Sequence, residues 1–61
     1  MLFEKIKKLA DEKHLSIKEL ESQAGLANGT IGKWRESEPG ALNLYKVSKI
    51  LGTSIDELVK D

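Results

Sequence analysis

The stretch that decides the fold runs from Ile17 to Glu36 and reads IKELESQAGLANGTIGKWRE. Its apolar residues recur at helical spacing on both sides of a glycine, a pattern that predicts two helices packed across a tight corner. The second helix then presents polar side chains outward at Asn28, Thr30 and Lys33. A helix that carries exposed hydrogen-bonding groups on a small, rigid support has the shape that a DNA major groove accepts.

Length and composition limit the kind of protein. The 61 residues make one domain, close to the smallest size that folds without disulfides or bound metal. The chain has no cysteine, which excludes disulfides, zinc–thiolate sites and thiol nucleophiles. No apolar run approaches the roughly 18 residues that span a membrane. Ten basic and ten acidic side chains give a net charge of zero, whereas DNA-binding domains usually carry a basic excess. Only the distribution of charge can therefore favour DNA.

Periodicity and capping signals predict five helical segments and no strand. The segments are residues 2–13, 17–24, 28 to 35 or 36, a fourth marked by Leu44, Val47 and Leu51, and 55–59. Ser16 with Glu19, and Ser54 with Glu57, have the spacing of capping boxes, which begin helices. The glycines after the second and fourth segments end them. All connections are short, so we expect sequential helices to pack as neighbours in one compact all-α bundle.

Several motifs together match a known family. They are I-x-x-L in the first helix, SIKEL and AGL around the second, NGTIGKW in the third, and PGALNLYKVSKILGTSIDEL over the last two. With these motifs the chain resembles the lambda-repressor/Cro class of helix-turn-helix DNA-binding domains, which are five-helix bundles of about this length. The resemblance covers nearly the whole chain. It looks especially like repressors and Cro-like regulators of Gram-positive bacteria and their phages.

The resemblance implies a sequence-specific binder of double-stranded DNA that acts as a transcriptional repressor or Cro-like regulator. Its partner would be a pseudo-palindromic operator, bound by a homodimer. The dimer would form through the last helix, at Ile55, Leu58 and Val59, or through a region beyond Asp61. Such a protein is not an enzyme and uses no cofactor or metal, and it works in the cytoplasm of a bacterium or a phage-infected host.

The family's DNA-binding positions can be transferred to this chain one by one. They are Ile17, Lys18, Ala27, Asn28, Gly29, Thr30, Lys33, Arg35 and Ser37. In the family, the start of the third helix meets base edges, where Asn28 suits adenine and Lys33 suits guanine or a phosphate. Backbone amides at the start of the second helix normally touch a phosphate. Residues just after the third helix often touch the DNA backbone again.

Some residues depart from the family's pattern. Ile17 stands where many relatives have a glutamine that contacts DNA, so any contact there is a backbone one. Glu21 stands where alanine is usual, and we expect its long side chain to lie sideways, out of the helix contact. Glu36 and Glu38 stand where a phosphate backbone should pass, and they would repel it unless a neighbouring cation neutralises them.

Two glycines inside the expected third helix need a reason, because each weakens a helix by about 0.5–1 kcal/mol relative to alanine. Either a bare backbone lets the helix approach the bases, or Gly32 only makes room for a neighbouring helix. A Gly29→Ala variant is expected to raise helix stability and to separate these interpretations.

The remaining chemical groups have structural interpretations. Trp34 shares a helical face with Ile31 and is expected in the core. His14 is expected to end the first helix in the left-handed conformation, which histidine tolerates. A lysine-rich face on the first helix is expected to be solvated, with phosphate contact as the alternative; it carries Lys5, Lys7, Lys8 and Lys13.

A second class of function stays open beside DNA binding. Antitoxins and regulatory partners use the same fold as a protein-interaction module with weak or no DNA binding. Zero net charge favours this class, and an apolar patch around Ile17, Leu42 and Val59 would mark its surface. The outward polar face of the third helix favours DNA.

Overall fold

The computed structural model describes residues 2–60, and every regular element in that range is helical. The elements are α1 (Leu2–Glu12), α2 (Ile17–Ala24), the 3-10 helix η1 (Ile31–Arg35), α3 (Ala41–Leu51) and α4 (Ile55–Val59). The all-α class is confirmed, but the third segment is a 3-10 helix, so the described residues hold four α-helices rather than five. None of these helices has the length and apolar character that a membrane crossing requires.

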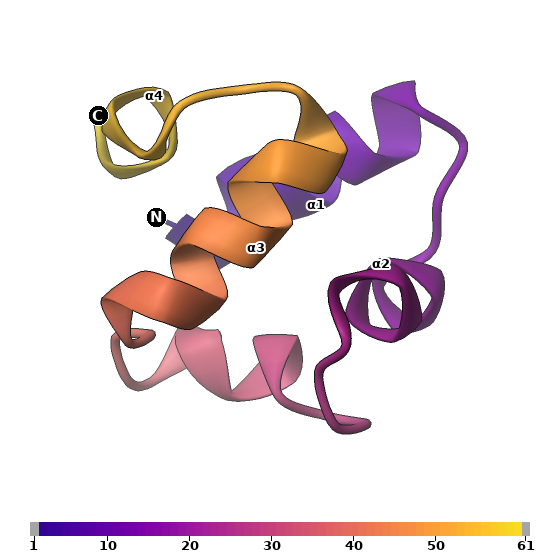
Figure 1. Ribbon diagram of the computed structural model, residues 1–61, viewed down its shortest axis with the longest axis horizontal. Helices are drawn as coiled ribbons and strands as arrows, with labels where there is room; N and C mark the ends of the chain where they lie inside the picture. Colours follow the sequence, from indigo (N-terminus) through magenta and orange to yellow (C-terminus); the bar gives the residue numbers. More distant parts are fainter. Residues whose placement is uncertain (1, 61) are drawn as a thin grey trace.

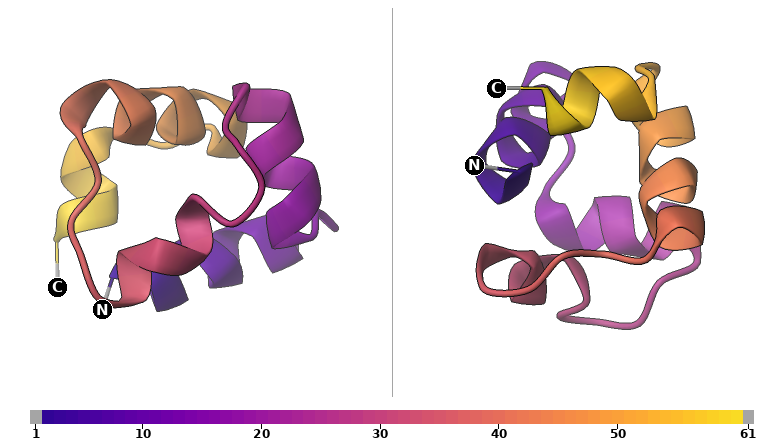
Figure 2. Two further views of the ribbon diagram at one scale, coloured as in Figure 1. Left: turned by 90° about the horizontal axis from the view of Figure 1, so that it is seen from below. Right: turned by 90° about the vertical axis from the view of Figure 1, so that its left-hand side faces the viewer.

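The helices enclose a single core. α3 packs against α2 and α4, while α1 packs against α2, α4 and η1 (Figure 1). The helix η1 lies across α1 and α2, at the end of the molecule opposite α4, as two views show (Figures 1 and 2). The segment from the opening sequence therefore forms one end of the domain, with one side of η1 facing solvent.

The core takes side chains from every helix. Ile31 and Trp34 from η1 are both buried, which confirms the expected position of the tryptophan. Because they lie three residues apart, they share one face of η1 and leave the intervening residues outside. The buried apolar side chains are Phe3, Ile6, Ala10, Leu20, Ala24, Ile31, Trp34, Leu44, Val47, Leu51 and Leu58.

Local capping fixes the start and end of α2. The Ser16 hydroxyl accepts the Glu19 N–H at 3.0 Å, and the Ser16 N–H donates to the Glu19 carboxylate at 3.0 Å, so the predicted capping box is confirmed. Gly25 then ends the helix with φ at 73°, a left-handed conformation that costs glycine little. His14 adopts φ at 60°, as expected at the end of the first helix.

The capping box makes the stability of the fold depend on pH. Hydrogen bonds from the Ser16 backbone and hydroxyl lower the pKa of Glu19 from its ordinary value of 4.5. Unfolding restores the ordinary pKa, so the stabilisation is present above pH 4.5 and is lost as the pH falls through the lower, folded-state pKa. When the pH is lowered from above 4.5 through the folded-state pKa of Glu19, we expect the melting temperature of the wild-type protein to fall more than that of Glu19→Gln. Glutamine can form the capping box without titrating. Equal losses in a thermal titration would contradict the expectation.

Lys5 joins the first helix to the last one. Its ammonium group donates to the backbone carbonyl of Glu57 at 2.9 Å and to that of Lys60. Glu57 lies in α4 and Lys60 is the residue that caps its end, where a helix leaves acceptors without partners. Lys5 is therefore not one of a row of solvated lysines, whereas Lys7 forms an exposed ion pair with Asp11 at 3.5 Å.

Candidate nucleic-acid interface

The turn between α2 and η1 is longer than the sequence predicts. Helix η1 begins at Ile31, and the predicted start at Asn28 is wrong. The reason is Gly29, whose φ of 88° is excluded from a right-handed helix. Asn28 and Gly29 therefore lie in a turn, which a bond from the Thr30 N–H to the Ala27 carbonyl closes at 3.1 Å.

The side chain of Glu21 reaches from α2 into this turn. Its residue is only 3% exposed, and its two carboxylate oxygens accept the N–H groups of Gly29 at 3.1 Å and of Ile31 at 2.8 Å. The expectation that Glu21 lies sideways, out of the helix contact, is therefore wrong. The turn directs these two donors inward, and buried N–H groups need acceptors. The Glu21 carboxylate supplies two acceptor oxygens, whereas an alanine side chain at this position would supply none.

The helix η1 is short and tightly wound. The Lys33 N–H is shared between the carbonyls of Gly29 at 3.3 Å and Thr30 at 3.2 Å. The Lys33 carbonyl in turn accepts the N–H groups of Glu36 at 3.1 Å and Ser37 at 3.0 Å, and also the Ser37 hydroxyl at 3.3 Å. These bonds close the end of the helix and hold the backbone beneath the Lys33 side chain.

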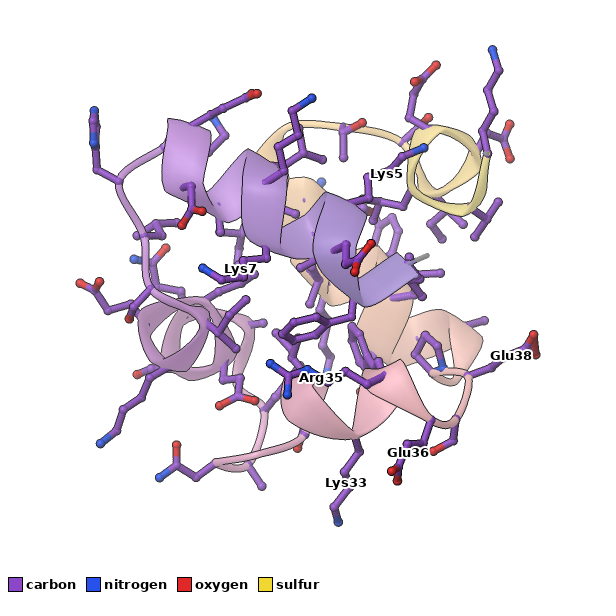
Figure 3. The ribbon with its side chains drawn as sticks, turned by 180° about the vertical axis from the view of Figure 1, so that it is seen from behind. Lys5, Lys7, Lys33, Arg35, Glu36 and Glu38 are labelled. Carbon is purple, nitrogen blue, oxygen red and sulfur yellow. The ribbon has the colours of Figure 1, made fainter. Side chains whose placement is uncertain are left out.

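Most of the predicted DNA-binding residues lie at the surface. Two are only partly exposed: Ile17, which packs against the core, and Thr30, which directly precedes η1. Figure 3 shows the Lys33 side chain pointing away from the body of the domain. The exposed members of the set are Lys18, Ala27, Asn28, Gly29, Lys33, Arg35 and Ser37.

Arg35 points in a different direction from Lys33. Its guanidinium lies 4.3 Å from the centre of the Phe3 ring, so it stacks on α1 rather than beside Lys33 (Figure 3). Such a cation–π contact contributes about 0.5–1 kcal/mol at an exposed site. No local sequence signal joins a residue at the start of the chain to one in the third helix, so sequence reasoning missed this contact.

Acidic and basic groups share the outer side of η1. Glu36 points to the same side as Lys33, and Glu38 extends from the following loop (Figure 3). The one ion pair within residues 2–60 joins Lys7 to Asp11, which leaves Lys33 without an acidic partner. Nor do three or more His, Asp or Glu side chains gather anywhere in that range to hold a metal ion.

The glycines of this segment border open space. A Cβ built on Gly29 or Gly32 would meet no heavy atom within 4 Å. The interpretation that Gly32 makes room for a neighbouring helix is therefore wrong. Close approach of another molecule to the bare backbone stays a prediction.

Two comparisons with known proteins agree with this geometry. The helix-turn-helix family model matches residues 6–58. A chain of the solved SinR protein/SinI protein complex has a TM-score of 0.92 and 30% sequence identity; the match covers 100% of this chain and 62% of that one. No curated protein matches the sequence significantly. The resemblance drawn from the sequence motifs is confirmed, and the chain belongs to the helix-turn-helix family, in the lambda-repressor/Cro class.

Proposed function

We propose that this chain binds double-stranded DNA sequence-specifically as a transcriptional repressor or Cro-like regulator in a bacterial or phage-infected cell. The observation that carries the proposal is the two-sided character of η1. Ile31 and Trp34 bury its inner side, while Gly32 and Lys33 lie exposed on its outer side. A recognition helix needs this combination of a fixed backbone and free side chains.

The proposed contacts divide between bases and phosphates. Asn28, from the turn, suits the N6 and N7 edge of adenine, and Lys33 suits guanine or a phosphate. Thr30 can bond a phosphate or place its methyl group beside a thymine. The first amides of α2, at Ile17 and Lys18, would bond a phosphate. Arg35 and Ser37 would meet the backbone beyond η1, for which Arg35 would have to leave the Phe3 ring.

A dimer is the second part of the proposal. The domain extends 24 Å in its longest direction and can read only a few base pairs, so specificity calls for two half-sites roughly 34–36 Å apart. Ile55 and Val59 remain candidates for the contact between copies. Leu58 does not, because it is only 1% exposed and belongs to the core. Since α4 lies opposite η1 (Figure 2), a partner bound there would leave η1 accessible.

Selection from a pool of random duplexes tests the proposal. At low and moderate salt we expect the wild-type protein to enrich a pseudo-palindrome. Lys33→Ala should then lose about tenfold or more of its preference for that sequence over random DNA, since a good base contact is worth about 1–3 kcal/mol of discrimination. The measurement is the ratio of the two dissociation constants.

The matched control removes a lysine elsewhere. Lys8 is exposed on α1, and Lys8→Ala should weaken binding to both duplexes equally, if at all. If Asn28→Ala and Lys33→Ala both leave operator affinity unchanged, neither the turn at Asn28 nor η1 reads the bases.

One observation favours the alternative of a protein-interaction module. A cavity of about 690 Å³ is lined by residues of α1, α3 and α4 and by the loop at Glu38 and Pro39, and Val59 is among its lining residues. Leu42 is also exposed, whereas Ile17 packs partly into the core, so the predicted apolar patch is smaller than expected. The solved relative is itself a complex of two proteins. Failure of the pool to yield any enriched sequence would favour this second function.

A further inference from the structure

Among residues 2–60, Glu21 of α2 makes more hydrogen bonds to the turn before η1 than any other residue does. Its backbone carbonyl accepts the Leu26 N–H at 2.8 Å, where the turn begins. Its carboxylate accepts the Gly29 and Ile31 N–H groups at 3.1 and 2.8 Å, where the turn ends. One residue of α2 therefore holds both ends of the segment that carries Asn28.

These bonds are the main polar constraint on the path of the turn. Ala27, Asn28 and Gly29 are exposed, so packing against the core does not fix their backbone. Gly29 has access to more of φ/ψ space than any other residue type and would otherwise leave the segment free to move. The carboxylate bonds the residue on each side of Thr30, which removes that freedom at the point where η1 starts.

We propose that Glu21 is a positioning residue for base recognition: it sets the place of Asn28 and Lys33 relative to the DNA without touching the DNA. This inference rests on the proposed function. It predicts that Glu21 contributes to the preference for one sequence and not to general affinity for DNA. A shift of the turn moves the groups that read base edges, whereas phosphate attraction depends on charge and is less sensitive to position.

Glu21→Gln and Glu21→Asp test the proposal. Glutamine has one acceptor oxygen instead of two, and its NH₂ group cannot accept the second N–H. Aspartate keeps the charge but is one methylene too short to reach both donors. We expect each variant to lose about tenfold in the ratio of operator to random-duplex affinity, because a recognition group must be held closely in place. Binding is measured at a temperature at which circular dichroism shows each variant folded.

Glu19→Gln is the matched control. It removes one carboxylate from the same helix, two positions away, and keeps the capping box. Loss of this negative charge should strengthen binding to both duplexes by the same factor and leave their ratio unchanged. A fall in the ratio for Glu19→Gln equal to that for Glu21→Gln would overturn the proposal, since the effect would then be one of charge alone.

Amide hydrogen exchange distinguishes the two possible failures. We expect the Gly29 and Ile31 amides to exchange faster in Glu21→Gln, with the amides of α3 unchanged. If they do so while the affinity ratio stays at the wild-type value, Glu21 has a structural role only and the inference is wrong. If the exchange rates of the Gly29 and Ile31 amides do not change, the Glu21 carboxylate does not bond these two amides. If the wild-type protein selects no operator, the proposed function fails, and the inference fails with it.

Discussion

Trp34→Ala is expected to leave much of the protein unfolded at 25 °C. Truncation of a buried tryptophan to alanine costs about 3–5 kcal/mol. Trp34 is only 7% exposed, and a domain of this size seldom has more than about 3–5 kcal/mol of stability from a single core. The loss would release η1 first, because Trp34 is one of the two buried side chains that attach η1 to the rest of the domain.

Circular dichroism checks this expectation in thermal and urea unfolding, since the variant lacks the only tryptophan. Trp34→Phe should lose less, because it keeps an aromatic ring in the same place. Tyr45→Ala is the matched control: it removes an aromatic residue that lies about half exposed on α3, and the melting temperature should change little. A Trp34→Ala variant as stable as Tyr45→Ala would show that Trp34 does not anchor η1.

Alanine at the two glycines of the interface is expected to act in opposite directions. Gly29 has φ at 88°, where an alanine side chain is strained, so Gly29→Ala should destabilise the fold by about 1–2 kcal/mol. Gly32 lies inside η1 with open space around it, and Gly32→Ala should stabilise the fold by about 0.5–1 kcal/mol. The expectation that Gly29→Ala strengthens a helix is wrong, because Gly29 is not in one.

Thermal unfolding measures both effects, at about 4–8 °C per kcal/mol for a domain of this size. DNA affinity adds a second test at Gly32. If Gly32→Ala is more stable but binds the operator less tightly, the bare backbone serves the approach of DNA. If Gly32→Ala gains stability and keeps its full affinity for the operator, the bare backbone at this position does not serve the approach of DNA. Equal melting temperatures for the two variants would contradict the assigned backbone conformations.

The sequence predicts well the features that arise from neighbouring residues. The capping box at Ser16 and Glu19 and the left-handed ends at His14 and Gly25 involve residues no more than a few positions apart. The types of residue at these neighbouring positions determine the hydrogen bonds and backbone conformations. The core position of Trp34 follows equally from its spacing to Ile31.

Contacts between distant parts of the chain were not predictable in this way. The Glu21 carboxylate bonds residues eight and ten positions ahead, and Lys5 bonds a carbonyl 55 positions ahead. Periodicity assigns such side chains only to a face, and the comparison of Glu21 with the family's usual alanine led to the wrong expectation that its side chain lies out of the helix contact. Leu58 was misplaced for a related reason: α4 packs against both α1 and α3, and Leu58 is the residue of α4 that is buried, whereas Val59 beside it stays exposed.

The attachment of α4 has a consequence for how the domain melts. A five-residue helix normally frays, because so short a helix is unstable alone. Here α4 cannot loosen without exposing Leu58 to water and releasing the carbonyls that Lys5 holds. We therefore expect the last helix to open together with α1, at nearly the free energy of global unfolding.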